Sequence, residues 1–346
     1  MRKYMFFIFT LVLIGLFVLL IEVSKAESRK PMIILKFASL APDGVGWAIN
    51  FRENMQKGVT RVTDGDVFID PYLGGVMGDD EDYIAKMRID QLHGAGLSAS
   101  GTVMACPQIA VLELPFLLNN FDEVEYIRTK MRQRLNRLFE KNGYRLWVLA
   151  DQDFDQIYST KNAIKTIEDF SKSRFVTWVG LVEQETLKAL GTSPIPLDVP
   201  EIPSSIRSKM CNAMFAPAIW YVGTQLYTVA KYVTPCKVRY SPGCIIATMK
   251  AWNRIPEKYH EPIEEVMEIS GKALNEYGHD SNKKCLKAMI KYGLKEVKLT
   301  PNEIEVLKKK TRPVWDKLAG KEYSRELLDE ISGYLAEYRS KEKEGN

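Results

Sequence analysis

The most constraining stretch of the chain runs from Asp169 to Pro217, where short apolar runs alternate with segments of helical spacing. The runs RFVTWV, SPIPLDV and CNAMF are short and rich in residues that favour strands. Between the first two runs, apolar residues recur at helical spacing up to Gly191, a residue type that commonly ends a helix. This alternation predicts a parallel unit of the βαβ type.

The first 26 residues have the three parts of a secretory signal peptide. A basic start (Arg2, Lys3) precedes an apolar run from Met5 to Ile21 and a small-residue end at Ala26. We therefore expect residues 1–26 to be a leader that exports the protein to the periplasm or another extracytoplasmic space. Anchoring by an uncleaved leader stays open, because an apolar run of about 17 residues is close to the shortest span of a bilayer.

Length and charge place the rest of the chain among soluble globular proteins. About 320 residues follow the leader, enough for two lobes with separate cores. The 48 basic and 44 acidic residues are intermixed and give a net charge of +4. Such a balance creates no strongly basic surface, so we expect no nucleic-acid partner.

The pattern along the chain predicts where the lobes divide. Strands are expected at residues 32–39, 67–72, 96–100 and 144–150, and helical spacing continues from Pro256 to Tyr292. Residues 218–232 are predicted to be helical, and residues 237–249 to be extended with a turn at Ser241-Pro242-Gly243. We assign 27–153 and about 241–270 to the first lobe, and 154–240 and about 271–346 to the second.

Five cysteines in an exported chain allow disulfides without requiring them. Cys236 and Cys244 bracket the predicted turn, and a disulfide between them stays open. Cys106 and Cys211 lie in apolar surroundings and are expected to be buried thiols.

Signs of catalysis are weak. The three histidines, His93, His260 and His279, are far apart and lack the spacing of metal ligands or of a catalytic triad. The glycines at 94 and 96 fit a dinucleotide fingerprint only loosely, since a helical pattern precedes them where a strand is required. We expect no enzyme activity, no cofactor and no metal.

Several motifs resemble the DctP-type solute-binding proteins of TRAP transporters. They include Gly74 to Asp79, Leu112 to Leu117 with Phe121 and Glu123, and Leu187 to Pro194. The resemblance covers nearly all of the chain after the leader. It implies a two-lobed α/β fold of the periplasmic-binding-protein kind, a ligand cleft between the lobes and a long helix crossing both. It also implies a monomer that captures a small molecule and delivers it to membrane subunits. A sensor or carrier that acts through partner proteins is the alternative.

The resemblance fails at the residues that hold a carboxylate. The family usually binds an organic acid with two arginines, which match a carboxylate by paired hydrogen bonds. Val176 and Asp155 stand in their places, and Ala216 replaces a usual amide. Arg174, two residues before Val176, is an alternative source of the lost guanidinium.

We therefore predict a ligand that is mainly apolar or aromatic, without an obligatory carboxylate, that places a hydroxyl, amide or cationic group towards Asp155. A core position explains Val176 or Phe215 taken singly as well as a binding role does, and Asp155 fits an exposed hinge loop equally well. The predicted ligand-binding residues are Trp47, Asp80, Phe154, Asp155, Val176, Trp178, Val199, Phe215, Trp220 and Tyr221.

Overall fold

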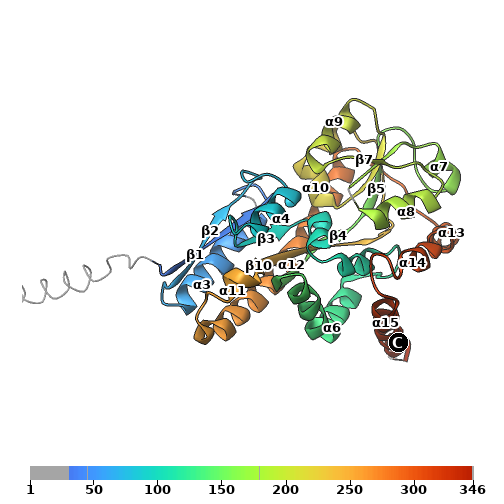
Figure 1. Ribbon diagram of the computed structural model, residues 1–346. Helices are drawn as coiled ribbons and strands as arrows, with labels where there is room; N and C mark the ends of the chain where they lie inside the picture. Colours follow the sequence, from blue (N-terminus) through green and yellow to red (C-terminus); the bar gives the residue numbers. More distant parts are fainter. Residues whose placement is uncertain (1–30, 45, 179, 345–346) are drawn as a thin grey trace, which may run out of the picture.

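The computed structural model describes residues 31–44, 46–178 and 180–344. These residues form two β-sheets with helices packed around each, joined by two chain crossings and one long helix (Figure 1). The expected α/β fold with two lobes is confirmed. The predicted leader, residues 1–26, lies outside the described residues.

The first lobe is built on a five-stranded sheet. Its first three strands are parallel, and β10 runs antiparallel between β3 and β4. The strand order is β2 (Val67–Tyr72), β1 (Ile33–Ser39), β3 (Gly94–Leu97), β10 (Tyr240–Thr248) and β4 (Tyr144–Phe154). Its helical segments are α2 (Gly46–Asn50), the π-helical η1 (Phe51–Gln56), α3 (Lys57–Val62), α4 (Asp80–Arg88), α5 (Ala99–Ala105), the 3₁₀ segment η2 (Pro107–Glu113), α6 (Phe121–Lys141), α11 (Met249–Trp252) and η5 (Glu257–Tyr259).

The second lobe is built on a six-stranded sheet. Strand β6 pairs in parallel with β7 and β8, so the predicted parallel unit is confirmed. The strand order is β11 (Lys295–Glu296), β9 (Tyr232–Thr234), β5 (Gln156–Ser159), β8 (Ala213–Ala216), β6 (Phe175–Thr177) and β7 (Ile195–Pro196). Its helical segments are α7 (Ile167–Ser171), α8 (Leu181–Ala189), η3 (Val199–Glu201), α9 (Ile202–Arg207), α10 (Ala218–Gly223) and η4 (Leu226–Thr228).

The two chain crossings lie against each other. Strand β4 leads through Asp155 into β5, and β9 leads through residues 235–239 into β10. The Asp155 amide donates to the Arg239 carbonyl at 2.9 Å, and the Val238 amide donates to the Asp155 carbonyl at 3.2 Å. The backbone thus holds the two crossings together where the chain changes sheets.

Helix α12 (His260–Tyr292) crosses both lobes, as expected (Figure 1). Its 33 residues extend for about 50 Å. Met267 packs in the core of the first lobe and Met289 in that of the second. Asn282 contacts both sides, because its amide nitrogen donates to Gln152 O at 2.8 Å and its oxygen accepts from Ile219 N at 2.8 Å.

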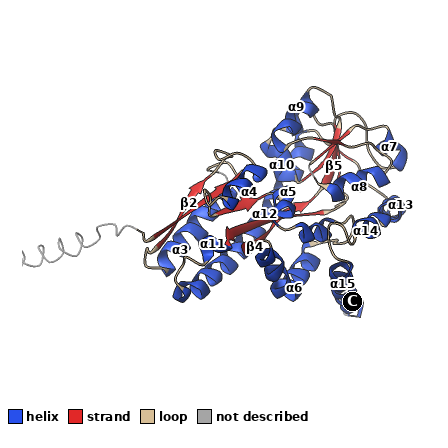
Figure 2. Ribbon diagram, in the orientation of Figure 1, coloured by secondary structure: helices blue, strands red, loops and turns tan. Residues whose placement is uncertain are grey.

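The C-terminal helices return towards the first lobe (Figure 2). They are α13 (Pro301–Thr311), α14 (Pro313–Leu318) and α15 (Arg325–Glu344). Helix α15 packs against α6, and Leu327 and Ile331 share a buried cluster with Leu135 and Phe139. We therefore place α15 with the first lobe, although the chain order placed residues 271–346 with the second.

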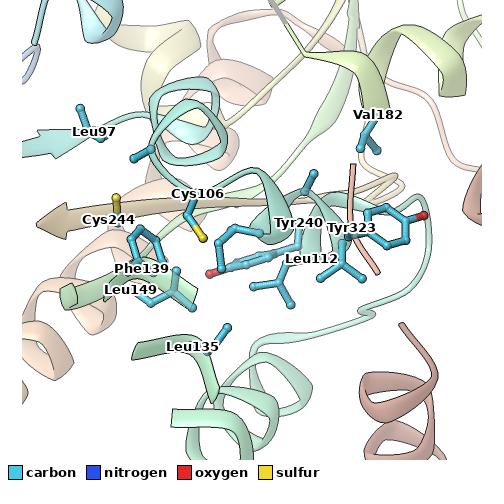
Figure 3. Packing of buried hydrophobic residues seen from close by; sticks show 14 of the residues in the cluster. Leu97, Cys106, Leu112, Leu135, Phe139, Leu149, Val182, Tyr240, Cys244 and Tyr323 are labelled. Carbon is cyan, nitrogen blue, oxygen red and sulfur yellow. The ribbon is translucent and has the colours of Figure 1, made fainter. Parts of the chain in front are cut away.

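The largest buried cluster reaches across the junction of the lobes. Figure 3 shows Leu112 and Tyr240 of the first lobe near Tyr323, with Val182 of α8 above them. Val182 and Tyr323 are almost fully buried. The lobes are therefore in apolar contact beside the cleft.

One predicted turn is wrong, and two predicted elements end earlier than expected. Residues 241–243 form no turn, because β10 continues through them as one strand with an irregularity between Ser241 and Pro242, where the missing amide of proline is tolerated. The strand predicted at 96–100 ends at Leu97, since the Ser98 side chain caps α5. The helix predicted at 218–232 ends at Gly223, and β9 begins at Tyr232.

The five cysteines are free, so the open question of a disulfide between Cys236 and Cys244 is answered in the negative. Cys244 is buried on β10 and accepts a hydrogen bond from Thr102 Oγ1 at 3.3 Å. Cys106 and Cys211 are fully buried, as predicted.

Candidate ligand-binding cleft

A narrow cavity lies between the lobes and is lined by both. Its volume is about 30 Å³, room for about two water molecules. Ligand pockets usually measure about 300–1,000 Å³, so a solute would enter only with separation of the lobes. The lining residues are Ser98, Ala99, Ser100, Val103, Ala110, Glu113, Gln152, Trp178, Gly180, Leu181, Val182, Glu183, Pro217, Arg239, Ser241 and Glu322.

A buried charged group, which we call the Arg239 cluster, forms one wall of the cavity. It consists of Arg239 with Glu113 from η2, Asp155 from the first crossing and Glu183 from α8. The guanidinium places Nη1 3.0 Å from Glu113 Oε2, Nη2 3.2 Å from Glu183 Oε2 and Nε 2.6 Å from Asp155 Oδ2. None of the four side chains is more than 4% exposed. Arg239 therefore links the two lobes through carboxylates on both sides.

The carboxyl groups of this cluster have raised pKa values. Burial raises the pKa of Glu113 to about 7 and that of Glu183 to about 8, although Arg239 opposes the shift in each case. Burial also raises the pKa of Asp155, against the same guanidinium. One cation is too little to keep three buried carboxyl groups in their ordinary ionisation range.

Hydroxyl groups form a second polar patch of the cleft at the start of α5. Asp80 accepts from the Ser98 hydroxyl and, at 3.3 Å, from the Ser98 amide. The Ser98 and Ser100 hydroxyls lie 2.9 Å apart. Burial raises the pKa of Asp80, while its bonds to Ser98 oppose the shift. Asp80 thus holds the serines that line the cavity and does not line it itself.

Trp178 contributes the aromatic part of the wall. Its indole nitrogen donates to Phe215 O at 3.1 Å, and its ring packs edge-on against that of Trp220 with 4.6 Å between the ring centroids. Because the indole donor is already used, the remaining contribution of Trp178 to the cavity is its apolar and π surface.

Comparison with known proteins gives the family. Residues 37–322 match DctP, the bacterial extracellular solute-binding protein family 7. The chain belongs to this family. The match spans both lobes, the crossings and the cleft.

Individual relatives are distant. An uncharacterized protein from Haemophilus influenzae is 22% identical over 211 residues, which are 61% of this chain and 64% of that protein. The chain thus spans slightly less than two thirds of this relative. The ectoine-binding periplasmic protein TeaA from Halomonas elongata is 21% identical over 295 residues, 79% of this chain and 82% of TeaA.

The fold is shared with solved structures. A TRAP periplasmic solute-binding protein from Haemophilus influenzae with bound L-gulonate superposes with a TM-score of 0.81 at 17% identity. The superposition covers 87% of this chain and 99% of the other.

The predicted site residues of this DctP-family chain are only partly brought together. Trp178 lines the cavity, and Asp155 lies in the Arg239 cluster, fully buried; an exposed hinge-loop position is therefore wrong. Phe154 is buried beside them, 5.6 Å from the ring of Tyr240. Trp220 reaches the cleft only through its contact with Trp178.

The other predicted residues lie away from the cavity lining. Val176, Phe215 and Tyr221 are core residues of the second lobe, and Tyr221 stacks on Tyr158 at 3.8 Å. Val199 lies in η3, and Trp47 packs on the second core of the first lobe. Their roles in ligand binding stay predictions.

Arg174 does not reach the cleft. Its guanidinium donates to Met210 O at 2.8 Å and to Lys209 O at 2.7 Å, in the loop before β8. The alternative that Arg174 replaces the lost carboxylate clamp is therefore not supported by this arrangement.

Sequence reasoning missed Glu113, Glu183 and Arg239. A signal was present in two of them, because Glu113 interrupts the apolar run from Ala110 to Leu118 and Arg239 stands between Val238 and Tyr240. A charge inside an apolar run is buried only with a partner, which could have marked both.

The described residues contain no group of three or more His, Cys, Asp or Glu side chains placed to hold a metal ion. Within the same ranges, none of the helices has the length and hydropathy needed to cross a bilayer.

Proposed function

We propose that the chain is an extracytoplasmic receptor that encloses a small organic solute between its lobes and delivers it to a TRAP-type membrane transporter. The solute lacks the carboxylate that this family usually binds. The observation that carries this proposal is that Arg239, the one arginine of the cavity lining, faces three carboxyl groups of the protein.

Charge explains why an organic acid fits poorly. A carboxylate that enters a dry cleft needs a cationic partner to replace its hydration, and an unpaired buried charge costs several kcal/mol, about 3–5 when one partner of a pair is removed. The L-gulonate of the Haemophilus influenzae structure carries such a group. Here Arg239 is already surrounded, and Glu113 and Glu183 would repel the ligand.

The remaining parts of the proposal follow from the family and the sequence. The predicted leader, residues 1–26, would export the protein, and the membrane subunits of a transporter would be its partners. We propose that the receptor acts as a monomer and without a catalytic step, since its cleft serves capture and release.

Small-angle scattering with native mass spectrometry tests the proposed receptor function. We expect the purified protein to carry or bind a small molecule without a carboxylate, and the radius of gyration to decrease on saturation as the lobes close. Trp178→Ala should weaken binding by about tenfold, whereas Tyr292→Ala, at an exposed aromatic far along α12, should not. Tight binding of a sugar acid would contradict the ligand class, and an unchanged scattering curve on saturation would contradict closure.

A further inference from the structure

The Arg239 cluster contains more acid than base. Three carboxyl groups surround one guanidinium, and burial together with the charge of Asp155 raises the pKa of the neighbouring Asp153 to about 7. With Glu113, Asp155 and Glu183 ionised, the cluster has an excess of two negative charges away from water. An excess of this kind is removed either by protonation or by a further cation.

Three of the carboxylate oxygens have no hydrogen-bond partner among the described residues. They are Glu183 Oε1 and both oxygens of Asp155, in side chains that are fully buried. Of these, Asp155 Oδ2 is ion-paired with Arg239 Nε at 2.6 Å. The Thr177 hydroxyl lies close enough to Glu183 to oppose the rise of its pKa, but its single proton is donated at 2.9 Å to the Trp178 carbonyl. Buried acceptors are nearly always paired, so unpaired carboxylate oxygens on a residue that lines a ligand cavity indicate a donor supplied from outside.

The rest of the cavity suits an organic cation. Trp178 presents π surface to it, and cations are attracted to the face of an indole ring. The Ser100 hydroxyl, which lies 2.9 Å from that of Ser98, can accept from an ammonium or amidinium group. Glu322, which also lines the cavity, adds another acid.

We propose that the cleft selects ligands with a cationic head group, an ammonium, amidinium or guanidinium, that contacts Glu183 and Glu113, with an apolar or aromatic body against Trp178. This inference rests on the proposed receptor function and names its ligand class. Arg239 holds the two acids in place and neutralises one of the three carboxylates. One added cation then leaves the cluster with a single excess negative charge.

Proton release provides a signature of this binding. Glu113 and Glu183 have pKa values raised to about 7 and 8, so both are partly protonated near neutral pH. The other charged groups that act on them are Arg239 and Asp155, and Lys237 acts on the neighbouring Asp153. A cation that enters beside the two glutamates favours their ionised forms, so its binding releases protons and strengthens as the pH rises from about 6 to about 8.

Calorimetry with three compounds of one shape tests the inference. The probes are benzamidine, benzamide and benzoate, which are a cation, a neutral amide and an anion on the same ring. At pH 7.5 we expect benzamidine to bind at least about tenfold more tightly than benzamide, and benzoate more weakly than both. Titrations in phosphate and in Tris, which differ in ionisation enthalpy, should report proton release for benzamidine alone.

Two variants assign the effect to Glu183. Glu183→Gln should weaken benzamidine by at least about tenfold, weaken benzamide by less, and reduce the proton release. Glu185→Gln removes the same charge from the same helix, where it faces Lys188 and Lys317, and should change none of these. Circular dichroism and a thermal melt check that both variants fold. If Glu183→Gln does not fold, Glu113→Gln replaces it in the same test.

The outcomes separate this inference from the proposed receptor function. Benzamidine bound no more tightly than benzamide, or bound without proton release, would overturn the cation preference. If native mass spectrometry finds a neutral solute that closes the lobes, the cation preference is overturned and the proposed receptor function still stands. Failure of every compound to change the scattering curve would count against both.

Discussion

Two buried charged clusters lie at the junction of the lobes, and they differ in the balance between acidic and basic groups. The Arg239 cluster has three carboxyl groups and one guanidinium. The second, which we call the Asp151 cluster, has one carboxylate among Arg128, Tyr240 and His279. Asp151 Oδ1 accepts from Arg128 and from the Tyr240 hydroxyl, and Oδ2 lies 2.9 Å from His279 Nε2.

The difference separates a structural contact from a candidate binding site. Both oxygens of Asp151 have partners, and these partners come from α6, β10 and α12, so the cluster fastens two elements of the first lobe to the helix that crosses both lobes. The Arg239 cluster joins opposite lobes and leaves carboxylate oxygens unpaired. A balanced cluster stabilises one arrangement, whereas an unbalanced one responds to protons or to a cation.

Removal of Arg239 should have the largest effect. Arg239→Met leaves three buried carboxyl groups without a cation, so we expect the free energy of unfolding to fall by about 4 kcal/mol at pH 8. At pH 5.5 protonation relieves the repulsion, and the loss should shrink to about 1–2 kcal/mol. Urea denaturation at the two pH values measures both. Arg254→Met, at an exposed arginine paired with Asp90, should cost less than about 1 kcal/mol. Equal losses at both pH values would remove the distinction between the clusters.

Neutralising Asp151 should have the next largest effect when the variants are compared at pH 8. Asp151→Asn deprives Arg128 and the Tyr240 hydroxyl of their carboxylate, at a cost of about 3 kcal/mol. Of these two partners, Arg128 stays charged and Tyr240 stays neutral between pH 5.5 and 8, because a guanidinium is always protonated in this range and burial raises the pKa of Tyr240. The measurement is the same urea titration. Glu125→Gln, at the exposed partner of Arg128, is the matched control and should cost less than about 1 kcal/mol. If Asp151→Asn lowers the free energy of unfolding by less than about 1 kcal/mol, the Asp151 cluster is not structural.

Removing one excess acid should have the smallest effect and the opposite sign. Glu183 has a pKa raised from 4.5 to about 8, so between these values the folded protein binds more protons than the unfolded chain. Stability therefore falls as the pH rises through this window, and Glu183→Gln should remove part of the fall and raise the free energy of unfolding at pH 8 by about 1–2 kcal/mol. Thermal melts from pH 5 to pH 8 follow the change. Glu185→Gln, whose pKa is lowered by Lys317 and Lys188 against its burial, should not stabilise the protein. A destabilised Glu183→Gln at pH 8 would mean that the cluster is balanced after all.

Local patterns in the sequence predicted much of the fold. The strand predicted at residues 67–72 and the helical stretch predicted to continue to Tyr292 are both present. Each depends on residues within a few positions of one another, whose spacing or capping chemistry is independent of the rest of the chain. The predicted turn at residues 241–243 is wrong because their pairing with β4 outweighed the local turn preference of Pro242 and Gly243.

The site was less predictable than the fold. Alignment with the family motifs showed the loss of arginines at 155 and 176, and this loss stands in the structure as a buried Asp155 and a core Val176. It could not show that Arg239 lies beside Asp155, since the two residues are 84 positions apart and meet only where the crossings pair. The sequence showed that arginine is missing at positions 155 and 176. It did not show that Arg239 places a guanidinium beside Asp155.

The sequence by itself determined the family, the two α/β lobes and the helix that joins them, because periodicity, caps and motifs are properties of short segments. Only the tertiary structure decided that residues 113, 155, 183 and 239 converge in one dry cluster at the cleft. The physical reason is that charge balance in a buried site is a sum over groups from different elements, and the burial that makes the imbalance matter exists only after the lobes have packed.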